Sequence, residues 1–334
     1  MRKEGERLFQ QNESRLLSNA ASLFGFENNS LKKLGSFESM VYEFTRNNAQ
    51  YILKLTHDSH RSLNQIRGEL EWTNYLGDNG VRVPRAIPSI TGSFVEPLNG
   101  GSSEFFTYAY EKSPGHHLTE EDWNDNLYFK WGEITGRMHA LTKKYRPSEN
   151  AIRRPSWFDD GYFKWVDSPE AESFEPDFLA ACRRNIEAYR GLPTDPGAYG
   201  LIHSDLHLGN LFVHEGEIIA FDFDDCRYDW FSHDLAIPLV YSLQDTKFGV
   251  KDIDFITRFF RKFMEGYYKE NDIDSFWLSK IPIFLKTREI DLYFIIKNEE
   301  IEDSNDWCRR FMKNRKEKIA NDEPVIDLDF ASLV

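Results

Sequence analysis

The chain has 334 residues, 40% of them apolar and 15% aromatic, and a formal net charge of −14, which suits two domains or one large one with a proper core. The acidic balance argues against nucleic acid as a partner, because nucleic-acid binders usually carry a basic patch. Three cysteines that fit no metal motif indicate a reduced, cytoplasmic protein, and neither a signal peptide nor an apolar run of roughly 18 residues suggests a membrane.

The first part of the chain is expected to form a helix followed by paired strands. Apolar residues recur at helical spacing over residues 6–24. Two small residues, Ser36 and Ser39, then precede strand-like runs at 41–45 and 51–55. Backbone N–H groups in such a loop can face phosphate oxygens, although a plain hairpin explains the same residues.

A single lysine interrupts the second of these strands. Lys54 lies between apolar residues, where a lone ammonium would be costly to bury without a partner. It either points outward from the sheet or contacts nucleotide phosphates and pairs with a glutamate, as the strand lysine of protein kinases does. The helix expected at 62–79 offers Glu69 and Glu71 as partners, and the spacing leaves both open.

The pattern changes from strands to helices after a β-prone run at residues 105–110. Helices are expected at 126–145 and 177–190. Between them, the aromatic-rich stretch 155–176 is either a packed surface loop or a flap over an acceptor site.

Two apolar runs that each end in acid carry the most specific pattern in the chain. The first contains Asp205 and, after four intervening residues, Asn210, and the second contains Asp222. The turn at Glu215 and Gly216 predicts a hairpin that brings Asn210 and Asp222 to the same end. Carboxylate and carboxamide oxygens suit Mg²⁺, which also takes water and substrate phosphate as ligands.

These three residues fit the phosphoryl-transfer arrangement of protein kinases. There a loop Asp accepts the hydroxyl proton, while an Asn and a later Asp hold the metal ions. His203 precedes the loop, but Ser204 stands where protein kinases carry Arg. With this His-Ser-Asp-x-x-x-x-Asn loop, the sequence resembles the aminoglycoside phosphotransferase and choline kinase-like family of small-molecule kinases.

The resemblance covers nearly the whole chain and implies an α+β, two-lobed protein-kinase-like fold. An antiparallel-sheet lobe over residues 1–111 would bind the nucleotide, and a mostly helical lobe over 112–334 would hold the catalytic loop and the acceptor site. Glu69 matches the position of the family's lysine partner. The backbone from Glu111 to Ser113 matches the hinge that receives the purine, and Asp234 matches an acid that supports the catalytic loop.

The function implied is an ATP- and Mg²⁺-dependent kinase that transfers the γ-phosphate to a hydroxyl of a small molecule. The acceptor could be an aminoglycoside, an amino alcohol or a sugar-like compound, and the sequence does not choose among them. Asp205 would act as the base or orient the hydroxyl. Asn210 and Asp222 would hold Mg²⁺, and Lys54 would position the phosphates. The missing loop Arg argues against a protein substrate.

Two other interpretations stay open. His203, Asp205 and His207 alternate, so on a strand they would share one face and could ligate zinc in a hydrolase. That interpretation leaves Asn210 unexplained and requires nothing of the N-terminal strands. The second alternative is a nucleotide-binding module without turnover, against which the intact set of Asp205, Asn210 and Asp222 speaks.

The remaining residues give weaker expectations. Asp224 is expected in a solvated acidic loop, with contact to a second metal ion as the alternative. Apolar stripes predict helices over 253–263 and 281–296. A charged final helix is expected near 299–319, where the acids of the first turn would cap the helix or bind an amine of the acceptor.

Overall fold

The computed structural model describes the whole chain except residues 1–2, 28–29, 37–38, 102, 160–161, 169–170, 172 and 245–252. The chain forms two compact units. The first unit comprises Met1–Gly115, Tyr145–Arg154 and Ile219–Asp224. The second comprises His116–Lys144, Pro155–Ile218 and Asp225–Val334. Two short late segments therefore belong to the first unit, whereas a division after residue 111 would assign them to the second. The expected assignment of nucleotide and acceptor binding to the two lobes stays a prediction.

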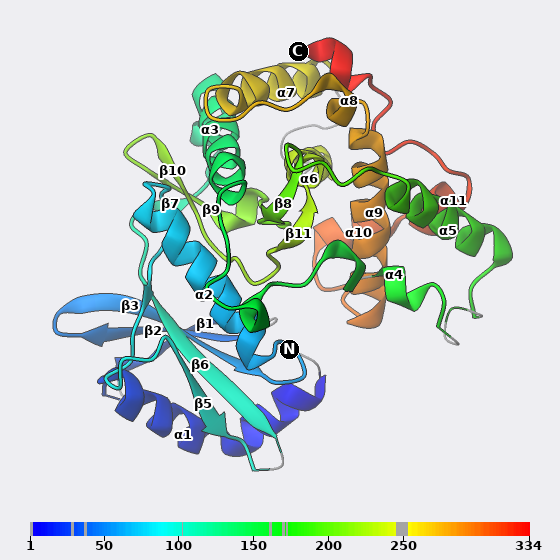
Figure 1. Cartoon of the computed structure of the whole chain (residues 1–334). Helices are drawn as coiled ribbons and strands as arrows, with labels where there is room; N and C mark the ends of the chain where they lie inside the picture. Colours follow the sequence, from blue (N-terminus) through cyan, green and yellow to red (C-terminus); the bar gives the residue numbers. More distant parts are fainter. Residues whose placement is uncertain are drawn as a thin grey trace. The chain divides into compact units, whose positions relative to one another are not determined.

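The first unit is built on a six-stranded antiparallel sheet with the order β1-β2-β3-β6-β4, in which β5 also pairs with β6 (Figure 1). Its elements are α1 (Lys3–Phe24), β1 (Lys32–Gly35), β2 (Met40–Arg46), β3 (Ala49–His57), α2 (Leu63–Asp78), β4 (Ala86–Ile87), β5 (Val95–Asn99), β6 (Glu104–Glu111) and η3 (Asn150–Ile152). Asn47 and Asn48, with φ of 52° and 65°, make the tight β2–β3 turn, which requires two left-handed residues. The expected helix and both expected strands are confirmed.

The central strand β6 divides its side chains between two helices, because successive residues of a strand point to opposite faces. Phe105 and Ala109 pack in the cluster that contains α1. Phe106 and Tyr108 pack on the other face, in the cluster that contains α2. Ser62 precedes α2 as its N-cap and forms a capping box with Gln65, which satisfies backbone donors at the first turn of the helix.

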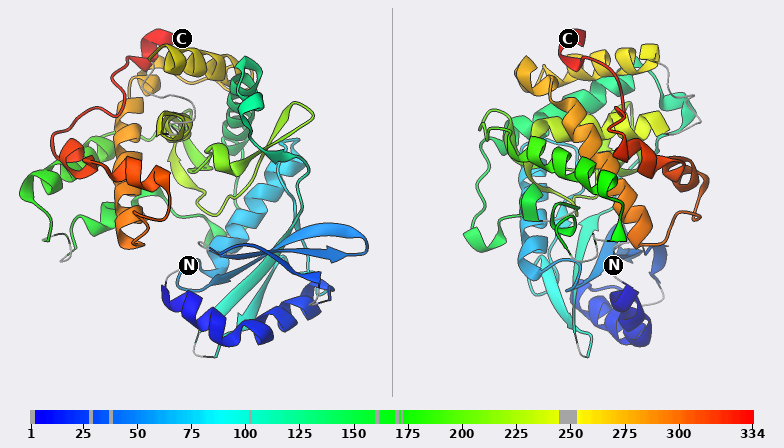
Figure 2. Two further views of the ribbon diagram at one scale, coloured as in Figure 1. Left: turned by 180° about the vertical axis from the view of Figure 1, so that it is seen from behind. Right: turned by 90° about the vertical axis from the view of Figure 1, so that its right-hand side faces the viewer.

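The second unit is mostly helical and carries two small sheets. Its larger elements are α3 (Asp125–Thr142), α5 (Pro176–Arg190), α6 (Phe231–Gln244), α7 (Ile253–Tyr267) and α9 (Ile281–Asn298). Short helices are η2 (Glu120–Asp122), η4 (Trp157–Asp159), α4 (Tyr162–Trp165), η6 (Leu208–Asn210), α8 (Ser275–Leu278), α10 (Asp306–Met312), α11 (Arg315–Ala320) and η8 (Phe330–Leu333). The strands are β7 (His116–His117), β8 (Tyr199–Ile202), β9 (Leu211–His214), β11 (Arg227–Trp230) and β10 (Glu217–Ala220), the last two residues of which belong to the first unit. Helix α9 packs against α5 and α6 (Figure 2).

Helices α3 and α7 approach each other backbone to backbone. A Cβ atom on Gly132 would lie 1.7 Å from the carbonyl oxygen of Phe263, and one on Gly266 would lie 1.9 Å from that of Phe129. Both distances are far inside van der Waals contact. A Cβ on Gly136 would likewise lie 2.6 Å from the carbonyl oxygen of Tyr267, so the close packing of these helices depends on three positions that lack a side chain.

The stretch at 155–176 packs several of its aromatic side chains, although Phe158 is exposed. Trp157 and Phe163 are buried, and their ring centroids lie 4.9 Å apart. Trp157 also contacts the ring of Tyr189 at 4.8 Å. The packed-loop interpretation is confirmed for these residues, while residues 160–161, 169–170 and 172 of the stretch lie outside the described part. A role as a flap stays a prediction.

The single final helix expected at 299–319 is wrong. The chain instead forms α10 and α11, which are separated by Asn314 with a φ of +55°. Asn305 caps α10 by accepting a hydrogen bond from the backbone N–H of Cys308. The break between α10 and α11 could not be predicted from the charge pattern. Neither Asn305 nor Asn314 interrupts the helical spacing of the apolar residues.

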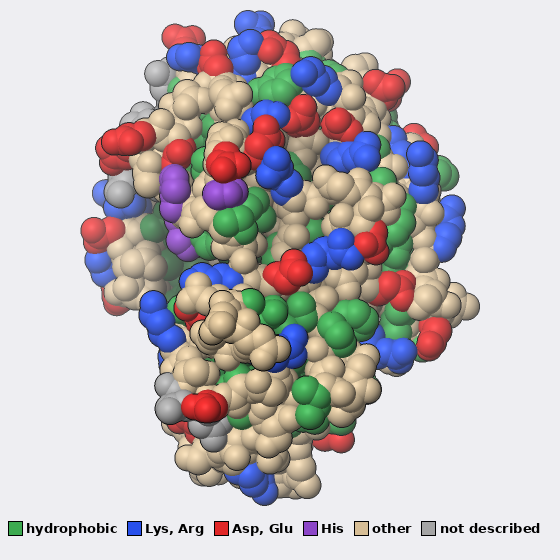
Figure 3. Space-filling view, turned by 90° about the vertical axis from the view of Figure 1, so that its left-hand side faces the viewer, with side chains coloured by type: hydrophobic (Ala, Val, Ile, Leu, Met, Phe, Trp, Pro, Cys, Tyr) green, Lys and Arg blue, Asp and Glu red, His purple; other side chains and the backbone are tan. Residues whose placement is uncertain are grey.

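Acidic and basic side chains are interspersed on the face that Figure 3 shows. Within the described residues, no helix is both long and apolar enough to cross a membrane.

Candidate active site

The loop that carries Asp205, residues 203–210, follows β8 and leaves strand geometry immediately. Ser204 has a φ of +70°, and the loop then passes through η6 into β9. Asp234, in the first turn of α6, accepts hydrogen bonds from the backbone N–H groups of His203 (3.0 Å) and Ser204 (2.7 Å). The expectation that Asp234 supports this loop is confirmed. His139 from α3 lies 3.2 Å from the same carboxylate and links the loop to the helical core.

Asp205 lies in this loop with both carboxylate oxygens engaged. Arg288 donates from Nη2 to Oδ1, while Asn210 Nδ2 lies 3.2 Å and His207 Nε2 lies 3.4 Å from Oδ2. Burial alone would raise the pKa of Asp205, but the attraction of Arg288 and then of His207 lowers it to about 2. Asp205 is therefore ionised at neutral pH and can accept hydrogen bonds.

The side-chain amide of Asn210 is oriented so that its oxygen, rather than its nitrogen, can bind a metal ion. Its Nδ2 donates to the backbone carbonyl of Asp205 over 2.9 Å as well as to the carboxylate. With the amide nitrogen engaged in this way, Oδ1 is the atom left to accept. The β9–β10 turn at Glu215 and Gly216, with φ of 52° and 78°, confirms the expected hairpin that follows Asn210.

A group of side chains around Asp205 was not predicted from the sequence. Arg288 from α9 donates to Tyr241 Oη over 2.6 Å in addition to Asp205. The Tyr241 ring stacks on His207 with centroids 4.3 Å apart, and on Trp307 with centroids 5.8 Å apart. Residues 281–296 contain four charged residues, so a charge in this apolar pattern does not by itself distinguish Arg288 from the others.

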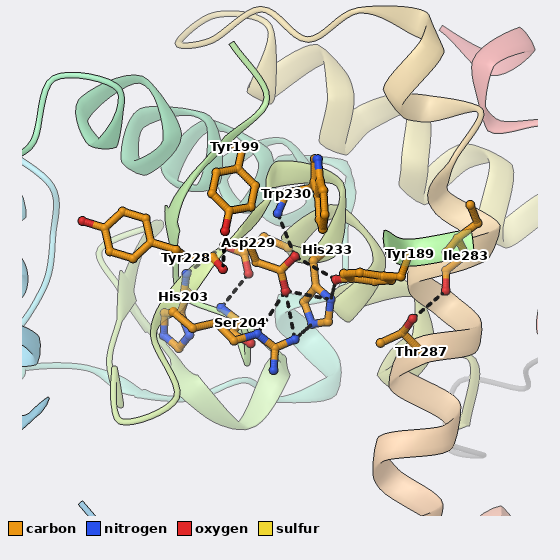
Figure 4. Close-up of polar contacts among 12 residues, drawn as sticks. Tyr189, Tyr199, His203, Ser204, Tyr228, Asp229, Trp230, His233, Ile283 and Thr287 are labelled. Atoms are coloured by element: carbon orange, nitrogen blue, oxygen red, sulfur yellow. Dashed lines mark hydrogen bonds and ion pairs between the residues drawn. The ribbon is translucent and has the colours of Figure 1, made fainter. Parts of the chain in front are cut away.

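A second buried network lies behind the loop (Figure 4). Asp229 accepts from Tyr189 Oη at 2.8 Å and from Arg227 Nε at 3.0 Å. Burial raises the pKa of Asp229 to about 6 despite the attraction of Arg227. His233 contacts Tyr189 Oη at 3.2 Å and the backbone of Ser204, so the network reaches the loop that carries Asp205.

In the first unit, Lys54 is buried in β3 and faces an acid. Its Nζ lies 2.6 Å from Oδ1 of Asp222, and its side chain is 11% exposed. The interpretation of an outward-pointing lysine is therefore wrong. Burial lowers the pKa of Lys54, but the attraction of Asp222 and then of Tyr108 and Glu69 raises it well above its usual value.

The glutamate next to Lys54 is Glu69, yet no hydrogen bond or ion pair joins the two within the described part of the chain. Glu69 is fully buried, and its Oε1 accepts from Tyr110 Oη over 2.6 Å. Glu71 points elsewhere and accepts from Tyr145 Oη and the backbone of Ser148, both at 2.8 Å. The helix phase that selects Glu69 is consistent with these contacts, but the expected Lys54–Glu69 ion pair is replaced by Lys54–Asp222.

Asp224 is buried rather than solvated, which corrects the expectation for this loop. It is 3% exposed, and its Oδ2 lies 2.7 Å from His60 Nε2 and 3.2 Å from Arg61 Nη2. Arg154 also donates to the backbone carbonyl of Asp224. Three cationic or ionisable side chains thus hold the segment that carries Asp222 within the first unit. Residue spacing alone does not reveal this cluster.

Some of the groups that were expected to contact the nucleotide make hydrogen bonds within the chain instead. Ser39 is buried and donates from Oγ to Thr56 Oγ1 over 3.0 Å, and Ser36 is half-buried. Residues 37–38 of the same loop lie outside the described part. At the expected hinge, the backbone N–H of Glu111 donates to Arg85 at 2.9 Å, and that of Lys112 donates to Gln50 at 3.3 Å.

Two of the three hinge N–H groups are therefore used by the chain itself. The prediction of purine binding therefore depends on Ser113 and on the backbone carbonyls of the hinge. The roles of Ser36, Ser39, Glu111 and Ser113 stay predictions.

The premise of the zinc interpretation is wrong. Residues 203–207 are not a strand, so His203, Asp205 and His207 do not share a strand face. His203 is fully buried, and its Nδ1 accepts from the backbone of Asp205. Among the described residues, no three His, Cys, Asp or Glu side chains gather as a metal-binding group.

Comparisons with known proteins agree with the kinase interpretation. The sequence pattern of the phosphotransferase enzyme family matches residues 30–262. The amicoumacin kinase of Bacillus subtilis (strain 168) is 35% identical over 331 residues, which is 96% of each chain. A solved structure of an amicoumacin kinase in complex with AMP-PNP, Ca²⁺ and Ami superposes with a TM-score of 0.90 at 32% identity and covers 100% of both chains.

A more distant solved structure shares the fold. The microcompartment-associated aminopropanol kinase has a TM-score of 0.72 at 21% identity, covering 92% of this chain and 98% of its own. Spectinomycin phosphotransferase, with a TM-score of 0.57 at 15% identity, covers 96% of both chains. These likenesses extend the two-lobed kinase-like fold over nearly the whole chain.

Proposed function

The chain belongs to the phosphotransferase enzyme family and is an ATP-dependent kinase that phosphorylates a hydroxyl of a small molecule, and from that premise we propose that its acceptor is amicoumacin. The observation that carries the proposal is the 35% identity to an amicoumacin kinase over 96% of both chains. The TM-score of 0.90 to a second amicoumacin kinase supports it, because the likeness extends through the C-terminal helices beyond the family pattern.

We propose that Asp205 orients the acceptor hydroxyl and receives its proton. The hydroxyl oxygen forms a bond to the γ-phosphorus while the bond from that phosphorus to the β,γ-bridging oxygen breaks, and ADP leaves. A carboxylate with a pKa of about 2 is a weak base, so it suits a reaction in which the proton moves late. A loose phosphoryl-transfer transition state needs positioning more than a strong base.

Asn210 and Asp222 are the proposed ligands of Mg²⁺, and Lys54 is the proposed contact to the phosphates. The proposal rests on donor chemistry, because the side-chain oxygen of an asparagine and the carboxylate of an aspartate are ligands that suit a hard cation. The ion would neutralise the phosphate charges that develop during transfer. Because two protein ligands are few, we expect nucleotide and Mg²⁺ to strengthen each other's binding in calorimetry.

The decisive experiment measures ADP release and phosphorylated product with amicoumacin as acceptor. Asp205→Asn should lower kcat by about 10²- to 10⁴-fold while ATP binding persists. Asp327→Asn is the matched control, since Asp327 is exposed in the same unit. ATP binding without any product in the wild type would instead favour the nucleotide-binding module. Product formation with Asp205→Asn at the wild-type rate would contradict the assignment of the base.

Two finer points belong to the same proposal. The net charge of −14 supports a small-molecule acceptor rather than nucleic acid. The scarcity of cysteine, with all three thiols free and buried, supports a cytoplasmic location.

A further inference from the structure

The guanidinium of Arg288 lies against the proposed base and carries a donor that the chain leaves unused. Its Nη2 donates to Oδ1 of Asp205 and to Oη of Tyr241. The side chain is 9% exposed, and within the described part of the chain neither its Nε nor its Nη1 has a hydrogen-bond partner. Nε is buried, so Nη1 is the donor of Arg288 that is left for a bound molecule.

The surroundings keep Arg288 charged and fixed. Burial opposes its charge, but Tyr241, Asp205 and Asp291 attract it and raise its pKa further above the usual value. The phenol ring of Tyr241 stacks on His207, with an interplanar angle of 19°, and on Trp307, with an angle of 10°. These contacts hold the phenol in place. The cation is thus anchored at two points, by the base and by the stacked phenol.

This placement restricts what can sit beside the reacting hydroxyl. An acceptor hydroxyl that is hydrogen-bonded to Asp205 is only one further hydrogen bond away from Arg288. A guanidinium offers donors only, so a carbonyl or carboxylate oxygen complements it. An ammonium in the same position would offer no lone pair and would be repelled.

We propose that Arg288 forms a subsite for a carbonyl-type oxygen next to the reacting hydroxyl, so that the enzyme selects hydroxylated amides over amino alcohols. The inference rests on the proposed function, because it requires Asp205 to bind the acceptor hydroxyl. Arg288 and Trp307 both lie beyond residues 30–262, the part that matches the family pattern. The subsite therefore belongs to the part of the chain where this protein can differ from other family members in its acceptor.

A matched pair of acceptors tests the proposal directly. 3-Hydroxypropanamide and 3-aminopropan-1-ol have the same hydroxyl and chain length, and differ in a carbonyl against an ammonium. The wild type should phosphorylate the amide with a kcat/KM about 10- to 100-fold higher, the range expected of one hydrogen bond to a charged group. A wild type that prefers the amino alcohol, or uses neither compound, overturns the proposal.

Variants of Arg288 separate substrate selection from support of the base. Arg288→Gln should raise KM for the amide about 10- to 100-fold and abolish the preference, while KM for ATP stays unchanged. Arg288→Lys keeps the charge without the planar fork, so it should restore part of the preference. Arg258→Gln is the control, because Arg258 is exposed on α7 and pairs with Asp125.

The readouts also keep the two proposals apart. If Arg288→Gln lowers kcat and leaves KM and the preference intact, Arg288 only positions Asp205 and the subsite is refuted. If amicoumacin is not phosphorylated but the amide is preferred over the amino alcohol, the proposed acceptor fails and the subsite stands. Melting temperatures identify a variant that does not fold, in which case Arg288→Lys decides between these outcomes.

Discussion

Replacing Glu69 with glutamine should stabilise the protein, and more so at alkaline pH. Glu69 is fully buried, with Oε1 accepting from Tyr110 and Oε2 without a hydrogen-bond partner in the described part of the chain. Burial raises the pKa of Glu69 from 4.5 to about 7, against the attraction of Lys54. Ionising this carboxyl in the folded protein is therefore unfavourable, and glutamine keeps the acceptor for Tyr110 without the charge.

The size and sign follow from proton linkage. A rise from 4.5 to about 7 corresponds to about 3 kcal/mol, at about 1.4 kcal/mol for each pKa unit. Because the folded state binds more protons than the unfolded state over this interval, the free energy of unfolding falls as the pH rises from 4.5. This loss of free energy of unfolding is absent below pH 4.5 and complete above about pH 7. Glu69→Gln should remove the loss.

Urea unfolding of the wild type and Glu69→Gln at about pH 5 and about pH 8.5 measures this difference. The gain in free energy of unfolding should be small at the lower pH and about 3 kcal/mol at the higher one. Glu71→Gln is the matched control, because Glu71 lies on the same helix but accepts from Tyr145 and Ser148. An equal gain at both pH values would show that folding does not shift the pKa of Glu69, and a loss at the higher pH would show that Lys54 stabilises the charged form. Either result would refute the reasoning.

Three further predictions concern catalysis and packing. Lys54→Ala should lower kcat/KM on the order of 10²-fold. Combined with Asp222→Ala it should be little worse than the more damaging single variant, because the two side chains are in contact; steady-state kinetics of the double-mutant cycle test this. Gly132→Ala should cost about 1–3 kcal/mol in urea unfolding, because its Cβ would meet a backbone carbonyl. Gly191→Ala, with its nearest atom 3.4 Å away, should stay within about 1 kcal/mol of the wild type. Asp234→Ala should lower kcat more than it changes KM for ATP, since it frees the loop N–H groups.

The sequence was most informative where chemistry and spacing pointed to the same residue. Lys54 could be identified because a lone ammonium in an apolar strand needs a partner, and the structure buries it beside an acid. The loop from Asp205 to Asn210 could be identified because its spacing is set within a few residues of chain. Both signals are local, so no knowledge of the fold was needed to read them.

Contacts between distant segments could not be predicted in this way. The partner of Lys54 in the structure is Asp222, 168 residues further on, rather than the glutamate of the next helix. Arg288 reaches Asp205 across 83 residues, and His60 reaches Asp224 across 164. In each pair, side-chain charge identifies a need for a partner but does not specify which one tertiary packing will supply.

The composition of the first unit has a consequence for how the protein is made. Its last segment, Ile219–Asp224, leaves the ribosome long after the sheet, and it carries both Asp222 and Asp224. A nascent chain that ends before this segment would bury Lys54, His60 and Arg61 without the carboxylates that they contact in the finished protein. The sheet can form early, but this lobe cannot reach its final stability until two-thirds of the polypeptide has been synthesised, and a fragment ending at Gly115 should not substitute for it.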